Sequence, residues 1–129
     1  MQLSERSKER LKGVHADLVK VVNRAVEFAA AEGLEFQITE GLRTLARQRQ
    51  LVAAGASTTM KSRHLTGHAV DFVPVVAGEI SWKWPAFWPL VDVFEKAAKE
   101  LGVAIEMGAR WRKFPDGPHV QLSQKEYPA

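Results

Sequence analysis

Three side chains that can bind a metal ion lie in two separated segments of the chain. SRHLTGHAVDFVP contains His64 and Asp71, and DGPHVQL contains His119. Two imidazoles and one carboxylate form a ligand set found in catalytic zinc sites, which leave a fourth position for water. Zinc lowers the pKa of that water to about 7, which supplies a nucleophile for hydrolysis. The two segments together therefore indicate a hydrolase site.

Asp71 is unusual because it interrupts the apolar run AVDFV, which has the composition of a strand. An unpaired carboxylate in such a strand carries a large desolvation cost. A bound metal ion would offset this cost, and so would a buried salt bridge or a set of hydrogen bonds. This segment alone leaves both interpretations open.

A second pairing, between His64 and His68, has the four-residue spacing of the HExxH zinc proteases. The residue after His64 is Leu65 rather than the glutamate that those enzymes use as base, and Gly67 before a strand argues against a helix. We therefore expect a bend at Gly67 that lets His64 and Asp71 converge, with no ligand role for His68.

Asp116 stands three residues before His119, across a Gly-Pro step. A turn at this step would bring both side chains to one site, where Asp116 could accept a proton from water and later deliver it to a leaving amine. Asp-Gly-Pro is also an ordinary loop sequence, so turn formation is the alternative role of Asp116.

Short helices and strands must position these residues. Apolar spacing predicts helices from Ser4 to near Gly33, at 44–55 and at 85–101, the last with Pro89 as an alternative start. Alternation predicts strands at 34–39, 68–74, 103–107 and 119–122, with Pro74 ending the second. We expect His15 to lie inside the first helix with a structural or surface role. Trp82, Trp84 and Trp88 are expected in the core, and the alternative is that they line a groove for glycan or peptide.

The bulk composition is that of one α+β domain with a small sheet and flanking helices, because 129 residues contain no linker or repeat. The absence of cysteine excludes disulfides and thiolate metal ligands. The N-terminus lacks the apolar stretch of a secretory signal, and no run has the length of a membrane span. A net charge of +3 suits an anionic partner. We do not expect nucleic acid, because basic residues are interspersed with acids and form no aromatic-basic block.

Three motifs resemble those of a known enzyme family. SRHLTGHAVD resembles the SxHxxGxAxD motif of the zinc D-Ala-D-Ala peptidases, the family of the VanX- and VanY-type enzymes. DGPH resembles the second motif of that family, and EGLRTLARQRQL resembles a Gly-x-Arg-Ser/Thr segment followed by glutamine. Motif order, spacing and chain length are most similar to the bacteriophage endolysins of this family, the L-alanyl-D-glutamate peptidases.

The resemblance implies a Hedgehog- and DD-peptidase-like fold with a small antiparallel sheet, in a single catalytic domain of residues 1–129 without a separate wall-binding domain. It implies one zinc ion bound by His64, Asp71 and His119, with Asp116 as catalytic base. Arg43 matches the arginine that polarises the scissile carbonyl and stabilises the oxyanion. A surface salt bridge is the alternative role for Arg43.

Further residues are implied to contact or support the substrate. Ser62 matches a serine near the polar end of the substrate, and Gln48 a residue that supports the site. His68 would contact substrate or solvent, and Trp111 belongs to a W-x-x-F-x-D phrase that leads to the catalytic aspartate. The segment Met107-Gly108-Ala109 departs from the Trp-Gly-Gly-like stretch that phage relatives have before the second motif.

The implied function is zinc-dependent hydrolysis of the L-Ala–D-Glu bond in the peptidoglycan stem peptide during phage lysis. We expect a monomer without stable membrane association, which accumulates in the host cytoplasm and reaches the wall after another protein permeabilises the membrane. A D-Ala-D-Ala carboxypeptidase or dipeptidase is the nearest alternative. A non-catalytic, zinc-stabilised binding module is disfavoured because Asp116 and Arg43 accompany the three ligands.

Overall fold

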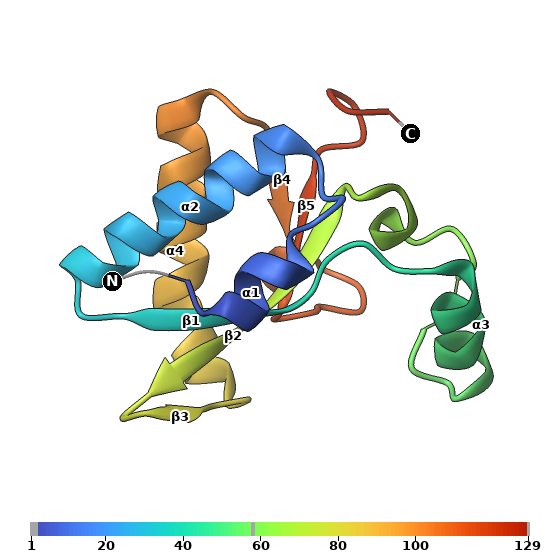
Figure 1. Cartoon of the computed structure of the whole chain (residues 1–129), viewed down its shortest axis with the longest axis horizontal. Coiled ribbons are helices and arrows are strands. Elements are labelled where there is room, and N and C mark those ends of the chain that lie inside the picture. Colours follow the sequence, from blue (N-terminus) through green and yellow to red (C-terminus); the bar gives the residue numbers. More distant parts are fainter. Residues whose placement is uncertain (1–2, 58, 129) are drawn as a thin grey trace.

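An antiparallel sheet forms the centre of the protein, in a computed structural model that describes residues 3–57 and 59–128 (Figure 1). Its strands follow the order β1-β2-β5-β4, and a short fifth strand, β3, pairs with β2. Their bounds are β1 Glu35–Glu40, β2 Ala69–Val76, β3 Glu79–Ile80, β4 Ile105–Met107 and β5 His119–Leu122. The predicted α+β class and antiparallel sheet are confirmed, and β3 is a strand that alternation did not predict.

Two long helices cover the apolar face of the sheet. α2 (Ala16–Ala31) and α4 (Trp84–Leu101) pack against each other and against β1 and β2. Alternate residues of the strands point toward these helices, and burying each large aliphatic or aromatic side chain contributes about 1.5–3 kcal/mol. The sheet side of this core consists of Phe36, Ile38, Val70, Phe72, Val120 and Leu122.

The first predicted helix is divided into two. α1 (Glu5–Arg10) ends before Gly13, whose φ of +81° is the left-handed conformation that stops a helix. α2 then begins after His15, which is its N-cap and accepts a hydrogen bond from the Asp17 backbone N–H at 3.1 Å. The prediction that His15 lies inside a continuous helix is therefore wrong, although its role is structural.

α1 covers the outer edge of β1 (Figure 1). The backbone N–H of Ile38 donates to the buried Ser7 hydroxyl at 2.9 Å, and Arg10 donates to the Ile38 carbonyl at 2.9 Å. These bonds satisfy edge groups that would otherwise be free to pair with another chain.

Both prolines with predicted boundary roles lie inside elements. Phe72 donates its backbone N–H to Pro118 on the β5 side, so the nitrogen of Pro74 faces the same side of β2. Pairing with β5 has ended there and pairing with β3 begins only at Val75, so the missing N–H leaves no ladder bond unmade. Pro89 lies within the first turns of α4, which starts at Trp84 rather than at Pro89.

α3 (Leu45–Ala53) stands apart from α2 and α4, at the right of Figure 1. Thr44 caps it by accepting a hydrogen bond from the Arg47 backbone at 3.1 Å, as expected of a threonine N-cap. Among the residues that the structure describes, no helix has the length and apolar character needed to cross a membrane.

Candidate metal centre and catalytic cleft

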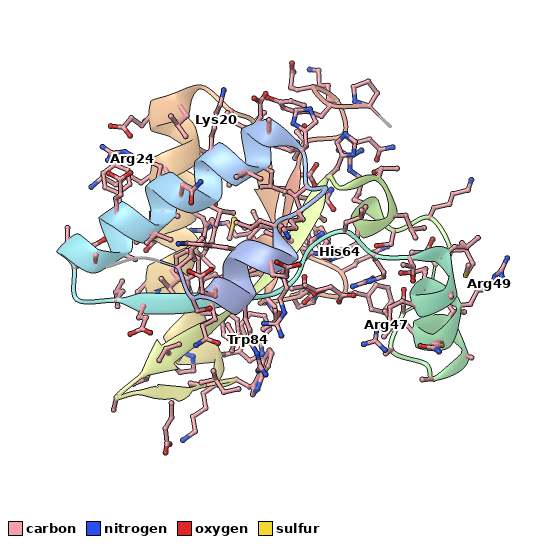
Figure 2. All side chains as sticks on the ribbon, in the orientation of Figure 1. Lys20, Arg24, Arg47, Arg49, His64 and Trp84 are labelled. Carbon is pink, nitrogen blue, oxygen red and sulfur yellow. The ribbon has the colours of Figure 1, made fainter. Side chains whose placement is uncertain are left out.

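His64, Asp71 and His119 meet on the polar face of the sheet. Asp71 Oδ1 lies 3.2 Å from His64 Nε2 and 3.4 Å from His119 Nδ1. One potential ligand atom from each residue lies within 4.8 Å of the others. Figure 2 shows His64 near the centre of the molecule, between the sheet and α3. These three side chains could hold a metal ion.

The hydrogen bonds of the two histidines leave His64 Nε2 and His119 Nδ1, the nitrogens nearest Asp71, free to bind a metal. His64 Nδ1 lies 2.9 Å from the Gly41 carbonyl, and His119 Nε2 lies 2.8 Å from Gln121 Oε1. Because both partners are acceptors, each ring donates its N–H there and directs the lone pair of its other nitrogen toward Asp71. Among the described residues, the buried His64 Nε2 and Asp71 Oδ1 have no hydrogen-bond partner. A lone pair that faces a carboxylate is repelled unless a proton or a metal ion lies between them, so the donor set fits a metal ion.

The electrostatics of the site also favour a cation. Burial on its own raises the pKa of Asp71, but the neighbouring His119 and His64 outweigh it and hold that pKa well below its usual range. Burial lowers the pKa of His119, and the Asp71 carboxylate reverses this effect, so the pKa of His119 is raised. Asp71 therefore remains negatively charged beside two imidazoles.

Strand register places these residues on one face. Asp71 of β2 is directly opposite His119 of β5, so both side chains point to the same side of the sheet, while the next residue, Phe72, points into the core. On the other side of β2, the register shifts between Ile38 and Glu40, and Glu40 becomes the partner of Asp71. This irregularity turns Glu40 from the core face to the polar face, as β-bulges beside active sites do.

Two glycines allow the close approach of these segments. Gly67 ends the 3₁₀ helix η1 (Arg63–Thr66) with a φ of +74°, and a Cβ there would collide with the carbonyl oxygen of Gly13. The predicted bend between His64 and β2 is therefore confirmed. At Gly108, a Cβ would lie 2.8 Å from the Cβ of His119, so glycine lets this loop pack directly against the site.

A cavity of about 570 Å³ lies over the three side chains, within the range of about 300–1,000 Å³ usual for small-molecule sites. Asp116, Trp111 and Ser62 line it together with His64 and Asp71. Burial and the Asp71 carboxylate raise the pKa of Asp116. A carboxylate with a raised pKa holds a proton more readily, which suits transfer to and from a reacting group.

Arg43 is held rigidly at the edge of this cavity. Its guanidinium donates twice to Glu40, at 2.8 and 2.7 Å, and once to Gln48 at 2.8 Å. Nη2 also lies 3.9 Å from Asp71 Oδ2, and the side chain is only 8% exposed. The alternative of a surface salt bridge is therefore wrong, because this arginine is largely buried and faces the site.

The other predicted substrate residues differ in their placement. Ser62 lies in the cavity wall, where its hydroxyl accepts from Arg43 Nη1 at 3.4 Å. Trp111 also lines the cavity, with its ring centroid 5.0 Å from that of His119. Gln48, expected to support the site, is fully buried and accepts a hydrogen bond from Arg43 Nη1 at 2.8 Å. It also donates to Ser57 at 2.9 Å, which supports the loop beside Arg43.

His68 does not line the cavity. Its Nδ1 lies 2.7 Å from the Thr66 hydroxyl, and its ring packs 5.4 Å from that of His15. His68 therefore lies half-buried outside the cavity wall, and its expected contact with substrate or solvent stays a prediction. His68 contacts the loop between α1 and α2, because η1 ends before it and turns it away from His64.

Two residues of the site were not predicted from the sequence. Gln121 orients His119, and the alternation in HVQL, which puts both on one face, was the signal that could have found it. Glu40 orients Arg43, but simple alternation assigns Glu40 to the core face together with Ile38. Only the register shift reveals its position.

Comparisons with known proteins agree with this geometry. Residues 1–124 match the family described as phage L-alanyl-D-glutamate peptidase. An L-alanyl-D-glutamate peptidase of Escherichia phage T5 is 37% identical over 136 residues, covering 94% of this chain and 97% of the relative. A protein of the same name from Listeria phage A118 is 36% identical over 114 residues, and the match spans 87% of this chain and 39% of that longer relative.

Solved structures have the same fold. The Serratia marcescens L-Ala D-Glu endopeptidase ChiX superposes with a TM-score of 0.92 at 45% identity, covering 100% of this chain and 95% of ChiX. The LD-carboxypeptidase LdcB has a TM-score of 0.66 at 15% identity, covering 95% of this chain and 64% of LdcB. At that identity the likeness to LdcB is one of fold alone.

Proposed function

Because the chain belongs to the phage L-alanyl-D-glutamate peptidase family and is a peptidoglycan peptidase, we propose that it cuts the L-Ala–D-Glu amide bond of the stem peptide as a phage endolysin. The observation that carries the chemistry is that the buried His64 Nε2 and Asp71 Oδ1 face each other without a hydrogen-bond partner among the described residues. They lie at a cavity that Asp116 and Arg43 also line. Hydrolysis of an amide needs these parts: a cation site, a proton carrier and a donor for the oxyanion.

His64, Asp71 and His119 would hold one zinc ion per chain. Two imidazole nitrogens and a carboxylate oxygen, without thiolates, are ligands of catalytic zinc sites. When bound, zinc supplies Lewis-acid polarisation of a carbonyl and lowers the pKa of water. The two second-shell acceptors, the Gly41 carbonyl and Gln121, keep both rings in the tautomer that binding requires.

Asp116 and Arg43 divide the remaining work. Asp116 takes a proton from the attacking water and gives it to the departing nitrogen, a role that its raised pKa assists. Arg43 donates an N–H to the oxygen of the scissile carbonyl as negative charge develops there. The bidentate bond to Glu40 and the bond to Gln48 hold the guanidinium in place before the substrate arrives.

The enzyme acts on the bacterial cell wall, as a monomer that reaches the wall from the host cytoplasm after a separate protein permeabilises the membrane. The phage origin of the two relatives supports this route. The net charge of +3 favours contact with an anionic polymer of the cell wall, and no nucleic-acid partner is proposed.

Digestion of purified peptidoglycan tests the proposed bond. We expect mass spectrometry of the soluble products to show new N-terminal D-Glu residues, with intact D-Ala termini. Release of free D-Ala as the only product would instead establish the carboxypeptidase alternative. An unchanged sacculus after prolonged incubation with zinc would contradict both.

Replacement of Arg43 with lysine should lower kcat by about 10²–10³-fold, the usual cost of losing one oxyanion donor. Lysine keeps the positive charge but cannot make the two parallel bonds to Glu40 that fix the donor's direction. Steady-state hydrolysis of a soluble muropeptide measures the effect.

The matched control is Arg47→Lys, on the surface of α3, where the guanidinium lies 4.0 Å from the same Glu40. Its activity should remain within about twofold of the natural protein, because exposed ion pairs contribute little. Equal values of kcat for the Arg43 and Arg47 variants would show that Arg43 does not stabilise the oxyanion.

A further inference from the structure

A second, smaller cavity of about 240 Å³ adjoins the catalytic cavity. Pro115 and Asp116 line both cavities, so the segment that carries the proposed base is a wall between them. Trp82 and Trp84 form the far side of the smaller cavity, above Phe87. Its volume is below that of most complete ligand sites, which suits a subsite for one part of a larger substrate.

The tryptophans of this cavity are not core residues, so the expectation of core packing is wrong. Trp82 is 59% exposed and Trp84 is 43% exposed, and the same expectation is wrong for Trp88, which is 39% exposed. Their rings lie 6.5 and 6.4 Å from the ring of buried Phe87, which anchors them from below. Indole rings that remain exposed to water add little to the stability of the fold. Beside an active site they indicate a surface that contacts a ligand.

The two ends of the combined cleft differ in chemistry. Near α3, Lys61, Ser57 and Thr59 line the catalytic cavity and provide one cationic and two polar groups. The opposite end is aromatic, with Trp82 and Trp84. Figure 2 shows Trp84 and the α3 residue Arg47 on different sides of His64. A substrate that fits this cleft therefore has an anionic part at the α3 end and, on the other side of the metal site, a part that stacks on indole.

The proposed scissile bond has such an asymmetry. Its D-glutamyl side carries a carboxylate, which suits the cationic end. On its other side a single alanine separates it from the lactyl group of N-acetylmuramic acid. An extended alanine spans about 3.5 Å and the lactyl group adds a similar length, so the sugar lies within roughly 7 Å of the scissile amide. The smaller cavity, which shares Asp116 with the catalytic cavity, is next to that position. The C–H groups of a pyranose ring stack on the electron-rich face of an indole.

We infer that Trp82 and Trp84 form a saccharide subsite that binds the N-acetylmuramic acid unit next to the scissile bond. This inference rests on the proposed function, because it places the sugar by its distance from the L-Ala–D-Glu amide. The subsite makes the enzyme prefer stem peptides that are still attached to the glycan. Asp116, shared by both cavities, couples occupancy of the subsite to the position of the amide.

The test compares two soluble substrates that differ only in the sugar: a muramyl peptide and the same peptide capped with a lactoyl group. For the natural protein, kcat/KM should be about 10-fold higher for the muramyl peptide, the gain expected from stacking one ring. Trp82→Ala and Trp84→Ala should each remove most of this preference while leaving kcat/KM for the capped peptide unchanged. Trp84→Tyr, which retains an aromatic face, should restore it.

Leu101→Ala is the control, because Leu101 is an exposed apolar residue at the end of α4 that lines neither cavity. Its substrate preference should equal that of the natural protein. Equal hydrolysis of both substrates by the natural protein, or an undiminished preference in the Trp82 and Trp84 variants, would overturn the subsite and leave the peptidase function intact. Failure to cut either substrate would overturn the peptidase function and the subsite with it.

Discussion

Asp71→Asn should abolish peptidoglycan hydrolysis and zinc binding together, with the fold retained. Asp71 is the side chain that both histidines approach, at 3.2 and 3.4 Å, and it supplies the negative charge of the ligand set. Asparagine has the same shape, and its amide N–H can donate to a histidine lone pair, so the metal-free protein should still fold. Without the charge of Asp71, the three ligands are all neutral and their attraction for a divalent cation is much weaker.

Thermal unfolding with and without zinc measures this prediction separately from activity. Zinc that binds only the folded state stabilises it by about 2.7 kcal/mol at a free concentration of roughly 100 times Kd, and the Tm of the natural protein should rise accordingly. The Asp71 variant should show no rise. A chelator should likewise remove the activity of the natural protein, and added zinc should restore it.

Asp92→Asn is the control for charge. Asp92 is an exposed carboxylate on α4 whose partner is Arg110, at 3.0 Å. This variant should keep both the zinc-dependent rise in Tm and the activity. A zinc-dependent rise in the Asp71 variant equal to that of the natural protein would refute the assignment of Asp71 as a ligand.

Asp116→Asn should lower kcat by about 10²–10⁴-fold, the contribution of a positioned general acid and base. Asparagine fills the same space in the cavity wall but cannot carry a proton between water and the leaving nitrogen. Zinc should still raise the Tm, because Asp116 is not one of the three side chains that could hold the ion. Loss of activity with zinc binding retained separates this variant from the Asp71 variant.

The stability of the metal-free Asp116 variant provides an independent readout. Burial and the Asp71 charge raise the pKa of Asp116 in the folded protein, so its ionised form is disfavoured there. Stability therefore decreases as the pH rises through the usual pKa of 3.8 and the raised folded value. At neutral pH, Asp116→Asn should be at least as stable as the natural protein, as expected where a functional charge is held in an unfavourable environment. Markedly lower stability with unchanged kcat would indicate a structural rather than a catalytic role.

The sequence by itself determined the features that depend on local spacing. Asp71 interrupts the apolar run AVDFV, and this interruption identified it as a carboxylate that needs a compensating partner. Gly67 marked the bend before β2, and its positive φ is a conformation that glycine adopts without strain. The three motifs indicated the same family that the comparisons identify.

Only the tertiary structure decided which side chains surround the ligands. Glu40 reaches Arg43 because the pairing of β1 with β2 shifts by one residue after Ile38, and strand pairing depends on residues far apart in the chain. Gln48 is buried beneath Arg43 because α3 is placed there by its loops. His68 is turned toward His15 for the same kind of reason. A local pattern specifies which face a residue occupies within one element, whereas the register and packing of separate elements specify what that face meets.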